Sequence, residues 1–287
     1  MVRRHLSGKN RATIDRAPSS FLAARKIPSS SPAPPALYLP TTMLPKVGRN
    51  LYAAALLAFA IQHVLYAVTG GGIGPPWIVG HTAWAWIMGA VLLVTSFSIA
   101  TGKQAGVIAA GFTVVLLFCV EIIYGRRLAA NIHNPGPWTS SAELICVAGA
   151  AFVIAGMHLT GKFSARAKLV GRILFALPLI VSAVQHFLYA GFIATLIPVW
   201  IPARLFWAYF VGIAFLAASA SIATRFKGWL GATLLGAMFL IWVLIVHAPR
   251  VVAASHNANE WTSLFVALTM CGGAWSISET LRGRIMG

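Results

Sequence analysis

Glutamine, histidine and tyrosine side chains recur as a group at two places inside long apolar segments of the chain. The groups are Gln62, His63 and Tyr66 in one segment and Gln185, His186 and Tyr189 in the other. Spacings of three and four residues keep the members of each group near one face of a helix. These side chains can bind a ligand or hydrogen-bond a neighbouring helix, and the two interpretations explain a histidine inside an apolar helix equally well.

Charged residues are rare in the apolar segments, and Glu121 is the most unusual of them. The sequence favours pairing of its carboxylate with Arg126 or Arg127, and the alternative is a proton or cation site. His247 and Arg250 extend the second polar group, so both join the candidate ligand-binding residues. The sequence assigns no catalytic residue.

The composition is that of a membrane protein. The chain has 287 residues, of which 59% are hydrophobic and 9% charged, and its mean hydropathy is +0.80. Soluble domains carry about 25% charged residues, so an ordinary soluble domain is excluded. The net charge of +17 does not indicate a nucleic-acid partner, because the basic residues lie mostly in a tail and in short loops.

Missing motifs exclude several kinds of chemical centre. The three cysteines form no C-x-x-C pair, which excludes a disulfide scaffold, a cysteine zinc site and a dithiol centre. There is no phosphate-binding glycine loop, nucleophile elbow or H-E-x-x-H motif. His63 and His186 could pair as haem ligands, but nothing in their spacing requires it, so we predict neither a haem nor a metal site.

The chain repeats itself at an offset of 123 residues. Residues 47–157 align without a gap to the sequence 123 positions further on, with roughly 35 identities. The alignment pairs Gln62-His63 with Gln185-His186 and Trp138-Thr139-Ser140 with Trp261-Thr262-Ser263. This pattern predicts a tandem duplication, with a basic tail at 1–46, a first membrane unit at 47–160 and a second at 161–287.

Each unit contains four apolar stretches of about 17–20 residues, long enough to cross a membrane as helices. They lie near 51–69, 84–101, 107–124 and 140–157, and near 173–191, 205–223, 229–248 and 262–278. The predicted fold is an all-α integral membrane protein with eight transmembrane helices in two parallel four-helix repeats. Ser140 and Glu143 together predict a capping box at the start of the fourth helix.

Basic residues predict the orientation in the membrane. All but four of the 22 Lys and Arg residues lie in the tail or on one side of the predicted membrane. The positive-inside rule then places both termini in the cytoplasm and both polar groups at the outer face. Because each unit has an even number of spans, the units insert in the same direction, related by an axis along the membrane normal.

Residues 1–46 are rich in Arg, Ser and Pro and hold a single acid, Asp15. Such a segment cannot bury enough apolar area to fold. The sequence favours either a translation start at Met43 or a disordered cytoplasmic tail attracted to anionic lipid, and a transit peptide is the third alternative.

Five short motifs of the second unit carry a family resemblance. They are QHFLYA (185–190), IPVWIP (197–202), LFWAY (205–209), HAPR (247–250) and EWTS (260–263). With them the chain resembles the DoxX-like family of small bacterial membrane proteins, as a tandem version with two units. The first unit matches less closely, since Gly74 and Val79 replace an isoleucine and a proline. The resemblance implies four-helix units in the bacterial inner membrane and, in some members, association with oxidoreductases that deliver electrons to quinone.

Three functional hypotheses follow. The leading one is a redox-associated subunit that binds a quinone or a lipid at the outer face, with membrane lipid and an oxidoreductase complex as its partners. The second is a small-molecule or proton-coupled transporter, in which Glu121 is the coupling carboxylate. The third is a non-catalytic membrane assembly partner.

Overall fold

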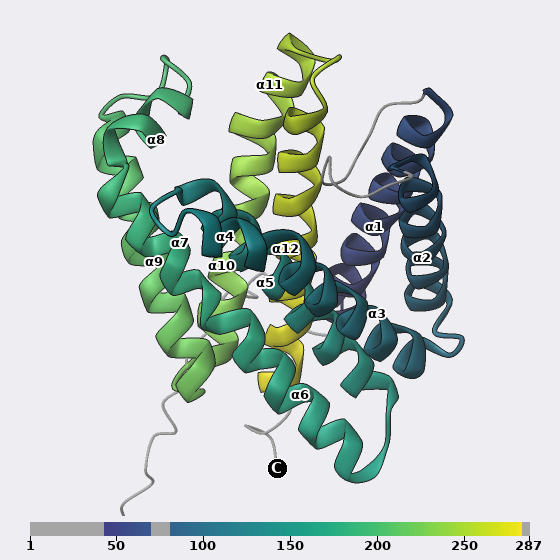
Figure 1. Ribbon diagram of the computed structural model, residues 1–287. Coiled ribbons are helices and arrows are strands. Elements are labelled where there is room, and N and C mark those ends of the chain that lie inside the picture. Colours follow the sequence, from purple (N-terminus) through teal and green to yellow (C-terminus); the bar gives the residue numbers. More distant parts are fainter. Residues whose placement is uncertain (1–42, 70–80, 283–287) are drawn as a thin grey trace, which may run out of the picture. The chain divides into compact units, whose positions relative to one another are not determined.

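A computed structural model describes residues 43–69 and 81–282, which belong to one compact unit (Figure 1). Within these ranges the chain forms α-helices, two short π-helical segments and their connections, and no strand. Most of the basic tail and the segment 70–80, which contains Gly74 and Val79, lie outside the described residues.

Eight helical spans in the described part of the chain are long and apolar enough to cross a membrane, which confirms the predicted all-α membrane fold. The first four are α1 (Met43–Thr69), α2 (His81–Thr101), α3 with η1 and α4 (Ala105–Cys119, Val120–Gly125 and Arg126–Ala130), and α5 (Pro135–His158). The last four are α6 with α7 (Gly161–Ala176 and Pro178–Leu188), α9 (Arg204–Thr224), α10 with η2 and α11 (Gly228–Trp242, Val243–His247 and Ala248–Ala253), and α12 (Ala258–Arg282). A short helix, α8 (Ala190–Leu196), follows α7.

The helices extend beyond the apolar stretches that predict them. The fifth span begins at Gly161 rather than near 173, because the basic first turns of α6 continue the same helical run. The predicted capping box is wrong: α5 begins at Pro135, and the Asn134 side chain accepts a hydrogen bond from the Gly136 amide. Ser140 and Glu143 therefore lie inside the helix.

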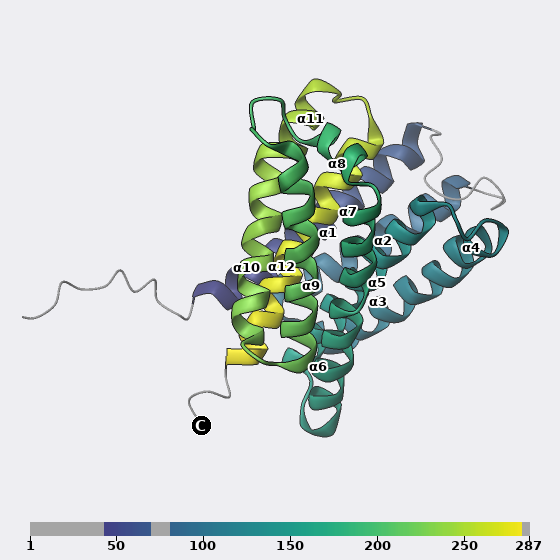
Figure 2. The ribbon, with the colours of Figure 1, turned by 90° about the vertical axis from the view of Figure 1, so that its left-hand side faces the viewer.

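α5 and α12 are the central helices of the bundle (Figure 1, Figure 2). α12 packs against α1, α10 and α5, and α5 packs against α3, α6 and α7. Glycines permit the closest approaches: a Cβ added at Gly149 of α5 would lie 2.5 Å from the Phe175 amide nitrogen. At Gly272 of α12, an added Cβ would lie 2.5 Å from the Tyr52 amide nitrogen. Small residues at helix crossings allow this backbone packing in membranes.

Several hydrogen bonds recur at the 123-residue offset of the sequence. The Trp138 indole donates to the Ile132 carbonyl at 2.8 Å, and the Trp261 indole donates to the Ser255 carbonyl at 2.9 Å. The two π-helical segments begin at Val120 and Val243, which are also aligned positions. The parallel arrangement of two repeats itself stays a prediction.

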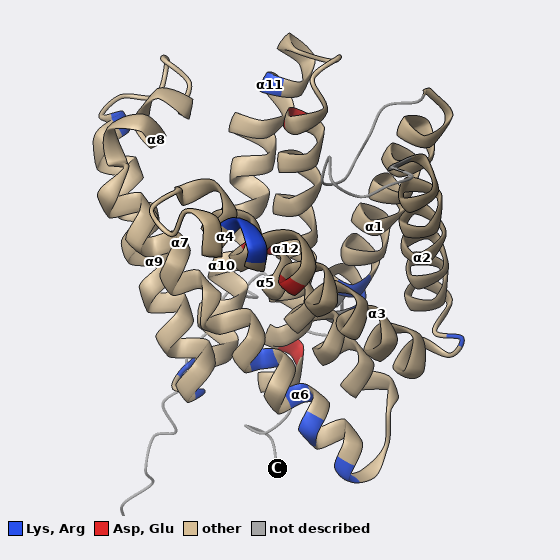
Figure 3. Ribbon diagram, in the orientation of Figure 1, with Lys and Arg blue, Asp and Glu red and all other residues tan. Residues whose placement is uncertain are grey.

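Basic residues gather at one end of the described bundle. Figure 3 shows Lys and Arg along α6, at the lower end of α9 and in the loop between α2 and α3. Near the opposite end, where α8 and α11 lie, Arg204 begins α9 and Arg250 lies in α11. The other two predicted outer residues, Arg126 and Arg127, lie in α4. The orientation in the membrane stays a prediction, and we call the end with α8 and α11 the predicted outer end.

Candidate functional site

A cavity of about 650 Å³ lies near the predicted outer end, among the second-half helices and α5. Residues from α5, α7, α8, α9, α10, η2, α11 and α12 line it. Five of the predicted candidates are among them: Gln185, His186, Tyr189, His247 and Arg250. The cavity also contains a carboxyl group that we did not predict as a site residue, that of Glu143.

Gln185 connects two helices at the cavity wall. Its side-chain amide nitrogen donates to the Pro135 carbonyl at 3.0 Å, and its amide oxygen accepts from the Thr139 hydroxyl at 2.8 Å. Both partners belong to α5, so Gln185 fastens α7 to the first turns of α5. The amide is thus used for helix packing, and this favours the interhelical interpretation for Gln185.

His186 is held in one orientation by the backbone of its own helix. Its Nδ1 lies 2.8 Å from the Ser182 carbonyl oxygen. A carbonyl can only accept, so Nδ1 carries the proton in this bond, and in the neutral ring Nε2 is left as an acceptor. The ring also packs edge-to-face against Phe215, with centroids 5.2 Å apart. A ligand that donates a hydrogen bond could use Nε2.

His247 lies at the end of the π-helical segment η2. Pro249 follows two residues later and lacks the amide hydrogen that an α-helix would use, which favours a local irregularity here. The aligned segment η1 is π-helical without a proline at the equivalent position, so proline is not the only cause. The His247 Nδ1 is buried and makes no hydrogen bond to the described residues.

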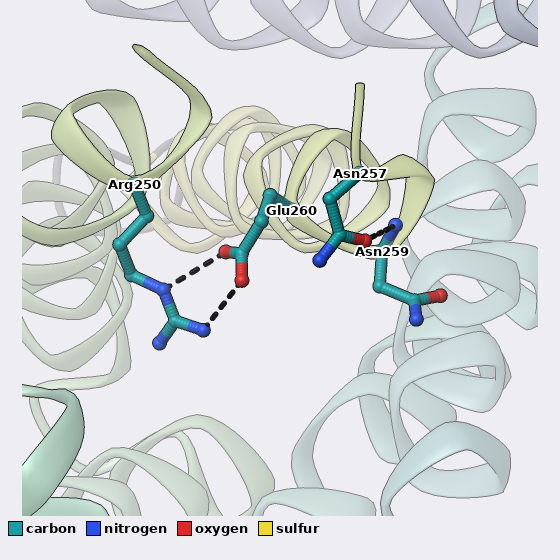
Figure 4. Close-up of polar contacts among 4 residues, drawn as sticks. All are labelled: Arg250, Asn257, Asn259 and Glu260. Atoms are coloured by element: carbon teal, nitrogen blue, oxygen red, sulfur yellow. Dashed lines mark hydrogen bonds and ion pairs between the residues drawn. The ribbon is translucent and has the colours of Figure 1, made fainter. Parts of the chain in front are cut away.

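Arg250 forms a two-pronged ion pair with Glu260 at the cavity rim (Figure 4). Its Nε lies 2.8 Å from Glu260 Oε2 and its Nη2 lies 2.7 Å from Oε1. The side chains are 36% and 14% exposed, so the pair is only partly screened by solvent. This geometry joins α11 to the first turn of α12 and neutralises the arginine.

Glu143 lies on α5, one turn beyond Thr139, and lines the cavity. It is eight residues from the start of α5, about 12 Å along the axis. No hydrogen bond or ion pair joins its carboxylate to any residue in the described ranges. A carboxylate at this depth is costly without a partner, so its placement at a cavity indicates a functional group. The sequence did contain one indication of this position: Thr139 and Glu143 are four residues apart, so they share one face of the helix.

Aromatic rings form much of the remaining wall. Trp207 of α9 and Trp242 of α10 meet edge-to-face with centroids 6.4 Å apart. Deeper in the bundle, Phe215 and Phe239 lie 5.8 Å apart, and Phe192 of α8 contributes to the lining as well. An apolar, aromatic cavity with a few polar groups is the usual form of a small-molecule site.

The first polar group does not line this cavity. The Gln62 amide nitrogen donates to the Thr262 hydroxyl at 3.0 Å and to the Ala258 carbonyl at 3.2 Å, which fastens α1 to α12. His63 Nδ1 lies 2.9 Å from the Phe59 carbonyl, a bond within α1. Tyr66 lies one turn beyond Gln62 on the same helix and is half-buried. Of the two polar groups predicted at the outer face, only the second therefore lines this cavity.

Glu121 is also separate from the cavity. It is an exposed residue in η1, and it is absent from the cavity lining. Its carboxylate lies beside Gly125 on the next turn, where an added Cβ would stand 3.4 Å from Glu121 Oε1. No group of three or more His, Cys, Asp or Glu side chains in the described ranges is arranged to hold a metal ion.

Comparisons with known proteins give no match to a family model, to a curated protein or to a solved structure. The resemblance to the DoxX-like family therefore stays a prediction from the quoted motifs.

Proposed function

We propose that the protein binds a membrane-soluble ligand, a quinone or a lipid, in the 650 Å³ cavity near its predicted outer end. The observation that carries this proposal is the pairing of an apolar, aromatic wall with His186, His247 and Glu143 inside one cavity. Apolar walls accept a hydrocarbon body or a ring, and a few polar groups orient its head. The cavity lies within helices that are long enough to span a membrane, so a ligand could enter from the lipid phase.

A redox-associated role is part of the same proposal and comes from the DoxX-like resemblance. The chain has no dithiol or nucleotide motif. Its three cysteines are all buried and unpaired. A protein of this kind would hold the ligand while a partner oxidoreductase supplies electrons. Co-purification of an oxidoreductase with the protein from native membranes would support this part, and its reproducible absence would count against it.

The binding proposal is tested with purified protein in mild detergent. Quinones and lipids that remain bound are extracted and identified by mass spectrometry, and decylubiquinone is then titrated while tryptophan fluorescence is recorded. The reduced probe decylubiquinol is titrated in the same way. We expect His186→Ala to weaken its binding about fivefold, the effect of one lost hydrogen bond, because the quinol hydroxyl can donate to Nε2. His63→Ala is the matched control, because His63 has the same backbone bond but does not line the cavity. A protein that retains no ligand and shows no saturable quenching would overturn the proposal.

Proton- or cation-linked transport is a second candidate, and Glu143 is the observation that favours it. The Glu143 carboxylate belongs to a spanning helix and lines the cavity, whereas Glu121 is exposed and does not line the cavity. Transport would require Glu143→Gln to abolish uptake in proteoliposomes, with Glu121→Gln active. Uptake that survives Glu143→Gln would exclude Glu143 as the coupling group.

We also propose that the protein lies in the bacterial inner membrane with both termini in the cytoplasm. The gathering of basic residues at the α6 end supports this orientation through the positive-inside rule (Figure 3). The buried native cysteines allow a labelling test. A membrane-impermeant maleimide should label Ser255→Cys in intact cells and Phe226→Cys only after permeabilisation, since both positions are exposed at opposite ends. The reverse pattern would invert the topology.

A further inference from the structure

Glu143 poses a charge problem that the described chain does not solve. Burying an ionised carboxylate requires a cation, several hydrogen-bond donors or a proton. Tyr124 of η1 and Cys146 on the next turn of α5 lie near it, and both side chains are ordinarily neutral at physiological pH. Within the described residues, no ion pair joins the Glu143 carboxylate to a basic side chain.

The cationic side chain in the cavity lining cannot serve as a positively charged neighbour of Glu143. Arg250 already holds Glu260 through two hydrogen bonds of 2.7 and 2.8 Å, so its charge is matched. His186 uses its Nδ1 proton for the Ser182 carbonyl, and its other nitrogen is an acceptor in the neutral ring. His247 also lines the cavity, and its neutral ring carries no charge. With both histidines neutral, the cavity lining carries one unmatched negative charge when Glu143 is ionised.

The walls around the cavity are suited to a positively charged guest. Trp207, Trp242, Phe215 and Phe239 present aromatic rings to it. Aromatic faces attract cations, and the attraction strengthens where water is excluded. A carboxylate combined with aromatic walls is a chemistry that selects an organic cation over a neutral molecule of the same size.

We propose that the cavity binds lipophilic organic cations, amphiphiles with an ammonium or other onium head and an apolar body, and that Glu143 is their counter-ion. This inference rests on the proposed function, since it names the ligand class of the same cavity. It favours an amine-bearing amphiphile over a neutral quinone as the natural ligand. The apolar body lies against the rings, and the charged head lies at α5.

The test compares two probes of similar shape and different charge. Tetraphenylphosphonium is a permanent cation and triphenylphosphine oxide is neutral, and both are measured by equilibrium dialysis against the full chain in nanodiscs. We expect the wild type to bind the cation, and Glu143→Gln to weaken that binding at least about tenfold through loss of the counter-charge. Binding of the neutral probe should be unchanged by Glu143→Gln. Glu121→Gln is the matched control and should bind the cation like the wild type.

A rescue variant separates loss of charge from loss of fold. Val266 of α12 lines the same cavity and is the residue that aligns with Glu143. The exchange Glu143→Val with Val266→Glu keeps one carboxylate in the cavity and should recover most of the cation binding that Glu143→Val removes. Recovery also requires a folded cavity, so it supports the inference even where the single variant is unstable.

The outcomes distinguish the two proposals. Equal cation binding by wild type and Glu143→Gln would overturn the counter-ion role and leave the cavity as a ligand site. Binding of decylubiquinone or the phosphine oxide without binding of the cation would overturn the cation inference and support the proposed function. Failure of all three probes to bind folded wild-type protein would overturn both.

Discussion

The polar groups of α1 and α7 have the same residues and nearly the same hydrogen bonds, yet only one of them lines the cavity. Gln62 and Gln185 each donate to a backbone carbonyl near the start of a central helix, α12 or α5. His63 and His186 each bond the carbonyl four residues before them. The shared residues therefore hold helices together on both sides of the molecule.

The residues that differ between the aligned halves give the cavity its chemistry. Glu143 aligns with Val266, His247 with Tyr124, and Glu260 with Pro137. By contrast, the groove of about 290 Å³ between α1 and α2 is lined by apolar residues and glycine alone. The repeated residues thus hold helices together in both halves, and departures from the repeat such as Glu143 and His247 add polar groups to the cavity. The following predictions test this division.

The largest expected losses of stability are at two aligned glycines, Gly149 of α5 and Gly272 of α12, where helices cross closely in both halves of the chain. A Cβ at Gly149 or Gly272 would overlap backbone atoms at 2.5–2.7 Å. Gly149→Ala and Gly272→Ala should each lower the free energy of unfolding by about 3 kcal/mol, the upper part of the usual range for overpacking. Thermal unfolding in detergent measures this. Gly111→Ala is the control, since nothing lies within 4 Å of an added Cβ there. If only one of the two variants lost stability, the two glycine positions would not be structurally equivalent.

We expect a smaller loss of stability, in the second half of the chain, when the ion pair between Arg250 and Glu260 is broken. Arg250→Met leaves the Glu260 carboxylate, whose side chain is 14% exposed, without its partner. The loss should be about 2 kcal/mol of unfolding free energy, since an abandoned, partly buried charge costs more than the pair contributes. The aligned Arg127→Met should cost less, because Arg127 is exposed and its guanidinium carbon lies 6.0 Å from the centroid of the Tyr124 ring. The double variant Arg250→Met with Glu260→Met should recover much of the loss; no recovery would contradict the pairing explanation.

The sequence predicted the spans well because their apolar stretches match the membrane thickness whatever their partners are. Five candidate ligand-binding residues named from the sequence line the cavity, and their role in binding stays a prediction: Gln185, His186, Tyr189, His247 and Arg250. It missed Glu143, because a serine three residues earlier imitates a capping box, while the helix start is set by Asn134 and Pro135. The Gln62 group lies apart from the cavity because α1 packs on one face of α12 and the cavity lies on another. Which face of α12 a helix packs against depends on the tertiary structure, so the sequence pattern does not predict it.

The smallest predicted loss of stability comes from replacing Gln62 or Gln185, and it tests most directly the comparison between the polar groups of α1 and α7. Gln62→Ala and Gln185→Ala each remove two hydrogen bonds between helices, to α12 and to α5 respectively. Interhelical hydrogen bonds in membranes contribute about 0.6 kcal/mol each, so each variant should lose about 1 kcal/mol of unfolding free energy. Thermal unfolding should therefore report equal losses, whereas binding of a cavity probe should weaken only in Gln185→Ala, because Gln185 alone lines the cavity. Equal losses of probe binding in both variants would mean that the shared groups act on the ligand together, and the division between structural repeat and functional exception would fail.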